Sequence, residues 1–304
     1  MKLIDAHVHV FERVKGFGFA GEMRPIGQGK IQLDTGEVSQ MFPAAFGDYG
    51  VLAEDFLSFM NRQGIDKAVV MQGPAYGYQN QYLAEVHKKY PNRFLPAAMI
   101  DPESFLFEPI LENLINRLGF RVFKLEMSTL GGIMGYHSSN TMLHPNMDKL
   151  FDEVERVHGT IAMDIGGPEE TSYQVERVAA LARSHPGLHV LMCHLLEPED
   201  MNLERLVANL AKLKLDNVWF DISSLPTILK EQPPYEKSVR CIQCGYEIVG
   251  AERLVWGTDA PGSLLRNDYQ TLLDYQVCQN PMFTDDERER ILYQNALEVY
   301  PFDA

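Results

Sequence analysis

The feature that most constrains the fold of this chain is a regular alternation of short apolar runs with longer amphipathic stretches. Eight apolar runs have the length and composition of buried strands: Lys2–His9, Lys67–Gln72, Phe94–Ile100, Arg121–Glu126, Thr160–Ile165, His189–His194, Val218–Ile222 and Leu254–Gly257. Amphipathic helical stretches lie between them: Leu52–Gln63, Gln79–Lys89, Phe105–Leu118, Met147–Val157, Ser172–Ser184, Leu203–Leu213 and Tyr235–Val249. Strand–helix alternation with short buried strands indicates a parallel sheet. Eight such units predict an α/β fold closed into a (β/α)8 barrel of the TIM type.

A doubly wound open sheet is the structural alternative to the barrel. That fold usually has fewer strands and often carries a Gly-rich phosphate turn, and no such turn follows any predicted strand. A barrel typically takes about 250 residues. The 304 residues, 45% of them hydrophobic, are enough for one barrel with several long loops. We therefore expect residues 1–304 to form a single domain.

Three connections are longer than the usual loop of roughly 4–6 residues. They are Phe11–Tyr49, Met127–Asn146 and Ser223–Pro234, after the first, fourth and seventh predicted strands. In a barrel of this kind, the loops that follow strands gather at the C-terminal mouth, where catalytic groups lie. We expect these loops, the first two above all, to cover a pocket there.

The formal net charge of −15 limits the partners of the chain. Nucleic-acid binding needs a basic face, and no cluster of Lys or Arg supplies one. An acidic surface disfavours anionic membranes, and no run approaches the ~18 apolar residues of a membrane span. The N-terminal residues lack the apolar core of a signal peptide, and four cysteines in a chain of this length do not suggest a disulfide framework. A cytoplasmic protein with a small-molecule substrate is the expectation, and a homo-oligomer is compatible with it.

The first predicted strand carries the strongest chemical signal. His7 and His9 alternate along it with Asp5, so the three side chains should share one face, with Ile4, Ala6, Val8 and Val10 on the other. Two imidazoles in this spacing near the end of a strand can bind one cation. An H-x-H motif is weak by itself, but its place before a long loop strengthens it.

Three further polar residues end predicted strands: Asp259, His194 and Asp164. Each has an ordinary structural interpretation, since Asp is common in turns and helix caps and a His can be a satisfied core residue. Together with His7 and His9, they would meet at the same mouth of one barrel. Neutral imidazoles and carboxylates suit Zn²⁺, Mn²⁺ or Fe²⁺, so the set predicts a metal site.

The chain resembles the amidohydrolase superfamily, and within it the amidohydrolase-related branch. That branch includes aminocarboxymuconate semialdehyde decarboxylase, resorcylate-type decarboxylases and lactonases. The matching segments are IDAHVH at the start, VLMCHLLEP at the sixth strand, RLVWGTDAP at the eighth and QNALEVYPF near the end. They span essentially the whole chain in the order typical of the family.

The resemblance implies roles for individual residues. His7 and His9 match the metal ligands of the first strand, and Asp259 matches an aspartate that binds metal or transfers a proton. His194 matches a histidine that orients the metal-bound water or the substrate. The resemblance also implies a single divalent cofactor, which we expect to be Zn²⁺ or Mn²⁺.

Two positions need separate interpretation. Many metal-binding members have a ligand histidine where this chain has Asp164. An aspartate there would be a harder ligand and favour Mn²⁺ more than an all-nitrogen site does. The alternative is a turn residue that accepts hydrogen bonds from the amides of Gly166 and Gly167. Lys124 occupies the position of a metal-bridging carboxylated lysine in other amidohydrolases, but we interpret it as a structural pair with Glu126.

Metal-dependent hydrolysis at the carbonyl of a small molecule, such as a lactone, cyclic ketone or amide, is the expected function. The cation would lower the pKa of its bound water. Asp259 would accept the proton of that water and return it to the leaving group. His194 would hold the polarised oxygen.

Non-oxidative decarboxylation is the alternative reaction on the same scaffold. It would need cations to dock a carboxylate, and Arg13, Arg24 and Lys15 in the first long loop are candidates. Tyr136 and His137 in the second long loop are further candidates for substrate binding. A hydratase and a barrel that binds without catalysis are also open, and the fold alone does not choose among them. The intact set of histidines and Asp259 argues against a barrel without catalysis.

Overall fold

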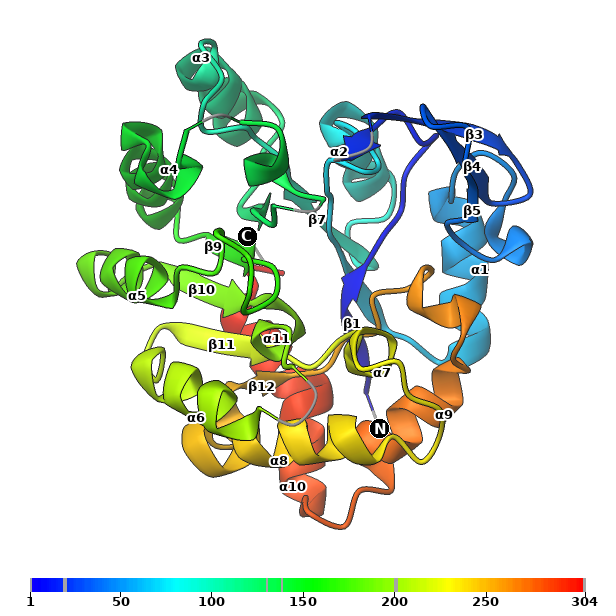
Figure 1. The fold of residues 1–304 in the computed structure, drawn as a ribbon, viewed down its shortest axis with the longest axis vertical. Coiled ribbons are helices and arrows are strands. Elements are labelled where there is room, and N and C mark those ends of the chain that lie inside the picture. Colours follow the sequence, from blue (N-terminus) through cyan, green and yellow to red (C-terminus); the bar gives the residue numbers. More distant parts are fainter. Residues whose placement is uncertain (1, 19–20, 130, 138, 200–201, 303–304) are drawn as a thin grey trace.

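The computed structural model describes residues 2–18, 21–129, 131–137, 139–199 and 202–302. Eight parallel strands form one sheet, in which each strand pairs with its neighbour along the chain. The strands are β1 (Ile4–Val8), β6 (Lys67–Val70), β7 (Phe94–Ala98), β8 (Val122–Glu126), β9 (Thr160–Asp164), β10 (His189–Met192), β11 (Val218–Asp221) and β12 (Leu254–Val255). Helices surround this sheet on the outside (Figure 1). The prediction of a (β/α)8 barrel is confirmed.

The barrel closes between its first and last strands. Val8 forms a parallel bridge with Ala260, just beyond β12. The amide of Ala6 donates to the carbonyl of Trp256 at 3.1 Å, and the amide of Asp259 donates to the carbonyl of His7 at 2.8 Å. The segment that carries Asp259 is thereby fixed against the segment that carries His7.

The predicted helices are present with small shifts at their ends. The longer ones are α1 (Ala53–Gln63), α2 (Asn80–Lys89), α3 (Phe107–Glu112), α4 (Pro145–Arg156), α5 (Val175–Ser184), α6 (Leu203–Lys212) and α8 (Glu236–Val249). The shorter ones are α7 (Leu225–Ile228), α9 (Tyr269–Leu273), α10 (Asp285–Glu289) and α11 (Asn295–Val299). Single 3₁₀ or π turns are η1 (Ala44–Phe46), η2 (Asn113–Arg117), η3 (Ile133–Gly135), η4 (Thr141–Leu143), η5 (Cys193–Leu196), η6 (Ala251–Arg253), η7 (Ser263–Leu265), η8 (Asp274–Cys278) and η9 (Arg290–Gln294). In the described part of the chain, we find no helix with the length and apolar character needed to cross a membrane.

The long insertion after β1 contains a small antiparallel sheet that the sequence analysis did not predict. Its strands are β2 (Phe17–Gly18), β3 (Gly21–Gly27), β4 (Lys30–Leu33) and β5 (Val38–Gln40). Gln28 and Gly29, both with positive φ, connect β3 to β4. Two such residues form the tight turn that suits a hairpin. The sheet lies at the edge of the barrel on the side of α1 (Figure 1).

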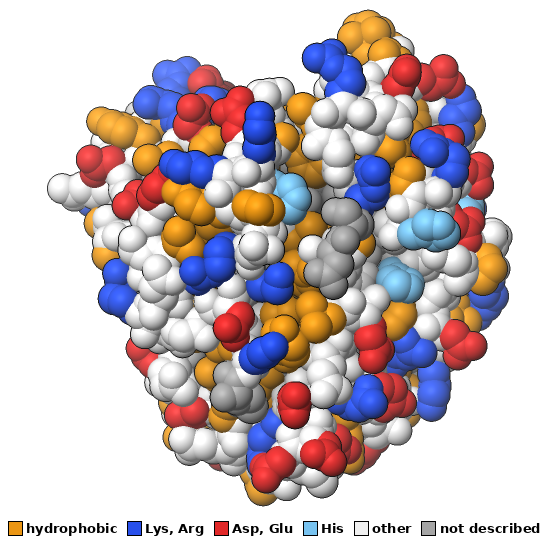
Figure 2. Space-filling model, turned by 180° about the vertical axis from the view of Figure 1, so that it is seen from behind, with side chains coloured by type: hydrophobic (Ala, Val, Ile, Leu, Met, Phe, Trp, Pro, Cys, Tyr) orange, Lys and Arg blue, Asp and Glu red, His pale blue; other side chains and the backbone are white. Residues whose placement is uncertain are grey.

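The core has an inner and an outer part. The inner cluster takes residues from all eight barrel strands: Ile4, Val69, Leu95, Val122, Ala162, Leu191, Trp219 and Val255. Tyr300, after α11, belongs to the same cluster. The outer cluster packs the strands against the helices. On the surface, acidic and basic side chains are interspersed over the face seen in Figure 2.

Strict alternation along β1 was predicted, and the structure corrects it. Ala6 belongs to the inner cluster with Ile4, whereas Val8 and Val10 belong to the outer one. The pairing of β1 with β6 shifts register between Asp5 and Val8, which breaks the two-residue period. The buried carboxylate of Asp5 accepts hydrogen bonds from the amide and hydroxyl of Thr258. Asp5 therefore links β1 to the segment after β12 and does not share a face with His7.

Candidate active site

A cavity of about 280 Å³ lies where the barrel strands end. The segment 72–76 after β6 forms part of its wall. The ionisable residues in the wall are His7, His9, Lys124, Glu126, Asp164, His194, Glu197 and Asp259. They come from the ends of five different strands, so the barrel brings together residues that are far apart in sequence. The wall includes every residue that the sequence analysis predicted as a metal ligand or catalytic group. These residues are His7, His9, Asp164, His194 and Asp259.

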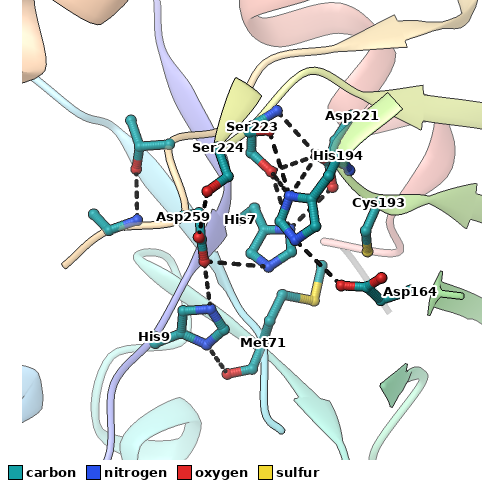
Figure 3. Close-up of polar contacts among 12 residues, drawn as sticks. His7, His9, Met71, Asp164, Cys193, His194, Asp221, Ser223, Ser224 and Asp259 are labelled. Atoms are coloured by element: carbon teal, nitrogen blue, oxygen red, sulfur yellow. Dashed lines mark hydrogen bonds and ion pairs between the residues drawn. The ribbon is translucent and has the colours of Figure 1, made fainter. Parts of the chain in front are cut away.

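His7, His9 and Asp259 form a group of potential metal ligands, with one ligand atom of each within 4.8 Å of the others. The Nε2 atom of His9 is 2.8 Å from Oδ1 of Asp259, and Nε2 of His7 is 3.9 Å from the same oxygen. The second oxygen of Asp259 accepts a hydrogen bond from the Ser224 hydroxyl at 2.7 Å. Figure 3 shows the two rings and the carboxylate turned toward one another.

The other nitrogen of each ring is held by an acceptor. Nδ1 of His7 lies 3.0 Å from Oδ2 of Asp221, and Nδ1 of His9 lies 3.1 Å from the carbonyl of Met71. An acceptor at Nδ1 places the ring proton there and leaves a lone pair on Nε2, as in metal-binding histidines. Burial lowers the pKa of His7 to about 4, so its ring is neutral near pH 7. Both rings thus turn Nε2 toward the carboxylate of Asp259, an arrangement that fits a cation among the three side chains.

Asp221 is a residue of this site that the sequence analysis did not single out. It ends β11, is fully buried, and also accepts hydrogen bonds from the amide of His194 and from Ser223. The available signal was a carboxylate at the end of a predicted apolar strand, the same signal that singled out Asp164. Asp221 also belongs to a second group of potential ligands, with His7 and His194. Its oxygens already accept hydrogen bonds from Ser223 and from the amide of His194, and Oδ2 lies 3.0 Å from Nδ1 of His7.

Asp259 and His194 are held in backbone conformations that non-glycine residues adopt rarely, with φ of 65° and 54°. Such conformations gather at functional sites. Burial alone would raise the pKa of Asp259, but the hydrogen bond from His9 and the nearby histidines lower it below the usual carboxyl range. Asp259 is therefore ionised at neutral pH.

The partners of His194 favour its charged form. Its Nε2 atom is 3.3 Å from Oδ2 of Asp164, and its Nδ1 atom is 2.8 Å from the Ser223 hydroxyl. Burial lowers the pKa of His194, but the hydrogen bond and charge of Asp164 outweigh burial and raise it to about 10. The ring stacks on His7 with centroids 4.7 Å apart. Both ring nitrogens of His194 thus have acceptors, Asp164 at Nε2 and Ser223 at Nδ1.

Asp164 lies beside the metal group without belonging to it. Its carboxylate contacts His194 and lies 3.6 Å from Nζ of Lys124, and it accepts a hydrogen bond from the amide of Gly166 at 3.0 Å. The turn interpretation is thus correct for Gly166. The amide of Gly167 donates instead to Glu170. Among the described residues, neither group of potential metal ligands includes Asp164.

The predicted pair of Lys124 and Glu126 is confirmed, with Nζ 3.4 Å from Oε2. The same ammonium group lies 3.3 Å from Sγ of Cys193. Burial and, after it, the charge of Asp164 together raise the pKa of Glu126 to about 8. The ammonium group of Lys124 thus has Glu126, Asp164 and Cys193 as neighbours in the wall of the cavity.

Comparison with known proteins identifies the family. A sequence profile described as Amidohydrolase matches residues 4–302. The chain belongs to the amidohydrolase family. An L-fucono-1,5-lactonase of Burkholderia ambifaria is 23% identical over 279 residues, which cover 87% of this chain and 89% of the lactonase.

Two solved structures have a similar fold. A probable 2-pyrone-4,6-dicarboxylic acid hydrolase of Acinetobacter baumannii with bound citric acid has a TM-score of 0.69 and 18% identity, over 98% of this chain and 99% of that one. A 2,6-dihydroxybenzoate decarboxylase from Rhizobium has a TM-score of 0.63 and 18% identity, over 84% of this chain and 90% of that one. At this level of identity, the likeness shows a shared fold.

The four residues predicted to bind substrate in this amidohydrolase lie outside the described wall of the cavity. The guanidinium of Arg13 packs over the ring of Tyr49 at 4.9 Å. Arg24 is exposed on β3 and pairs with Glu22. The ring of Tyr136 packs against Phe17, and His137 binds Asp101 at 2.8 Å. The insertion after β1 and the loop after β8 thus contact each other through Phe17 and Tyr136.

Proposed function

We propose that this amidohydrolase hydrolyses a lactone or a similar cyclic ester of a small molecule, with one divalent metal ion held by His7, His9 and Asp259. The observation that carries the proposal is the pair of histidines whose Nδ1 atoms are bound by Asp221 and Met71, which leaves both Nε2 atoms facing Asp259. The curated lactonase similar to this chain supports the choice of a lactone. Mixed nitrogen and oxygen ligands suit Zn²⁺ or Mn²⁺.

Each residue around the site would have a separate role in hydrolysis. A divalent cation in such a site lowers the pKa of water and polarises a carbonyl. The ionised Asp259 is placed to accept a proton and to return it to the leaving alcohol. The positive charge of the His194 ring, which Asp164 favours, would stabilise the negative charge that develops on the carbonyl oxygen. Asp164 would keep His194 protonated and oriented.

The proposed ligands His7, His9 and Asp259 can be tested by metal analysis. Purified protein should contain about one equivalent of Zn²⁺ or Mn²⁺, and chelation should abolish lactone hydrolysis until metal is restored. A His7→Ala, His9→Ala double variant should lose both metal and activity. A wild-type protein that hydrolyses lactones while free of metal would contradict the ligand assignment.

Decarboxylation is the second reaction to test, because a decarboxylase shares the fold. Such a reaction would need a cation for the substrate carboxylate, and the only Lys or Arg in the described wall is Lys124, whose ammonium group already has acidic partners. Lactones and aromatic carboxylic acids should therefore be assayed side by side with the metal-loaded protein. Ring opening without release of CO₂ is the expected result.

A further inference from the structure

The acidic residues of the cavity differ in whether their oxygens already have partners. Asp259 contacts His9 and Ser224, and Asp164 contacts His194 and Lys124. The oxygens of Glu126 are taken by Lys124 and by the amide of Ser128. Glu197 is the exception, because its carboxyl group makes no hydrogen bond or ion pair with any residue that the structure describes.

A turn with unusual backbone geometry brings Glu197 to the cavity. His194, Leu195, Leu196 and Glu197 have φ between 44° and 65°, which places four successive residues without glycine in the left-handed region. The amide of Glu197 donates to the carbonyl of His194 at 2.9 Å. The two middle residues are buried in the outer core, while His194 and Glu197 at the ends of the turn both line the cavity.

The charged side chains in the wall of the cavity limit which substrate groups can bind beside Glu197. Lys124 is the one Lys or Arg in the described wall, and its ammonium group lies near Glu126, Asp164 and Cys193. The residues outside the described ranges include no Lys or Arg. His194, also in the wall, contacts Asp164 in the same way. An anionic substituent on the substrate would therefore find no free side-chain cation here, whereas a hydroxyl group could donate to the carboxyl group of Glu197.

We propose that Glu197 is a substrate-binding residue, and that the cavity takes a neutral lactone bearing hydroxyl groups in preference to a lactone bearing a carboxylate. This inference rests on the proposed lactonase function and names its substrate class. Glu197 accepts a hydrogen bond from a substrate hydroxyl, while the metal group holds the ester carbonyl. The strained turn serves to fix this carboxyl group relative to His194.

Binding of lactams tests the inference without requiring turnover. The probes are a polyhydroxylated six-membered lactam, unsubstituted valerolactam and pyroglutamate, each titrated calorimetrically into zinc-loaded protein. We expect the hydroxylated lactam to bind best. Glu197→Ala should weaken its binding by about 3- to 10-fold, the range for an ordinary hydrogen bond that is lost. Valerolactam binding should not change, and Glu197→Gln should retain part of the preference because its amide oxygen still accepts.

Glu199→Gln is the matched control, because Glu199 lies in the same loop, outside the wall of this cavity, near Arg205. It should bind all three probes like the wild type. The inference is overturned if Glu197→Ala binds the hydroxylated lactam as well as the wild type does, if pyroglutamate binds best, or if no lactam binds. Lactam binding that follows Glu197 in a protein without lactonase activity would support the substrate class and refute the proposed reaction.

Discussion

The two histidines that we propose as metal ligands are each oriented by a contact at Nδ1. His7 is buried and is oriented by Asp221, 214 positions later in the sequence. His9 is oriented by a backbone carbonyl, which no substitution at Met71 can remove. A carboxylate partner fixes the ring proton on one nitrogen of a histidine and raises the basicity of the other nitrogen. We therefore expect substitution of Asp221 to lower metal affinity more than substitution of any other residue outside the ligand group.

Replacing Asp221 by Asn should weaken metal binding by about 10- to 100-fold, the usual effect of losing such a partner. The amide can donate to Nδ1 and so favour the wrong tautomer of His7. Competition with a zinc chelator measures the change. Asp152→Asn is the control, since Asp152 is an exposed carboxylate that also contacts a histidine, His185, away from the cavity. Equal zinc affinity in Asp221→Asn and the wild type would show that Asp221 does not orient a ligand.

Asp164 provides a second test at the residue scale. Asp164→Ala should keep close to one equivalent of metal, because the carboxylate contacts His194 and Lys124 and not the ligand group. Its kcat should fall by about 100-fold or more, the usual effect of losing one oxyanion donor, since His194 would lose the partner that keeps it protonated. Metal content and kcat are the measurements. If Asp164→Ala loses its metal and Asp164→His recovers it, Asp164 is a ligand after all.

At the level of secondary-structure elements, the seam between β1 and the segment after β12 sets the geometry of the site. It carries His7 on one side and Asp259 on the other, with Asp5 and Thr258 hydrogen-bonded across it. Gly257 lies in this seam, where a Cβ atom would be 2.9 Å from both the backbone nitrogen and Cβ of His7. The two segments can approach this closely only because position 257 has no side chain.

Gly257→Ala should therefore push His7 away from Asp259. We expect a loss of about 1–3 kcal/mol in the free energy of unfolding, the usual cost of overpacking, and at least a tenfold loss of zinc affinity. Urea unfolding and chelator competition measure the two effects. Gly262→Ala is the control, because a Cβ there would meet its nearest atom only at 3.8 Å. A Gly257→Ala protein with unchanged zinc affinity would mean that the seam does not position His7.

For the whole molecule, stability depends on how the end of the barrel opposite the cavity is filled. The C-terminal helix α11 and Tyr300 pack into the inner cluster formed by all eight strands. Tyr300 is 1% exposed, and its hydroxyl has no hydrogen-bond partner among the described residues. The ring thus stabilises the barrel, while the hydroxyl is an uncompensated buried polar group.

These two contributions can be separated. Tyr300→Phe should raise the free energy of unfolding by about 1 kcal/mol, since it removes a buried polar group without a partner. Tyr300→Ala should lower it by about 3–5 kcal/mol, the usual cost of deleting a buried aromatic ring. Urea denaturation measures both, and metal content should stay the same in each variant. A clear loss of stability in Tyr300→Phe would reveal a hydrogen bond to the hydroxyl and contradict the first expectation.

The sequence alone was sufficient to predict the eight strands, the helices between them and the barrel, because periodicity and composition are local properties that survive without knowledge of the fold. His7, His9, His194 and Asp259 were predicted at the cavity for a similar reason. Each ends a strand, and parallel strands in a barrel end at the same mouth. The hairpin turn at Gln28 and Gly29 was also a local signal, and it was overlooked.

Only the tertiary structure decided which roles these residues can take. Asp221 acts on His7 across 214 positions, and Asp164 gives His194 its charge. The register shift in β1 turned Asp5 away from His7, and Arg13 and Arg24 found partners outside the cavity. The left-handed turn that positions Glu197 contains no glycine, so the sequence gives no signal of its backbone conformation. The charge state and orientation of a side chain, and whether it can bind a metal, depend on contacts with residues that are distant in sequence. These contacts form only when the barrel closes, so the local sequence does not encode them.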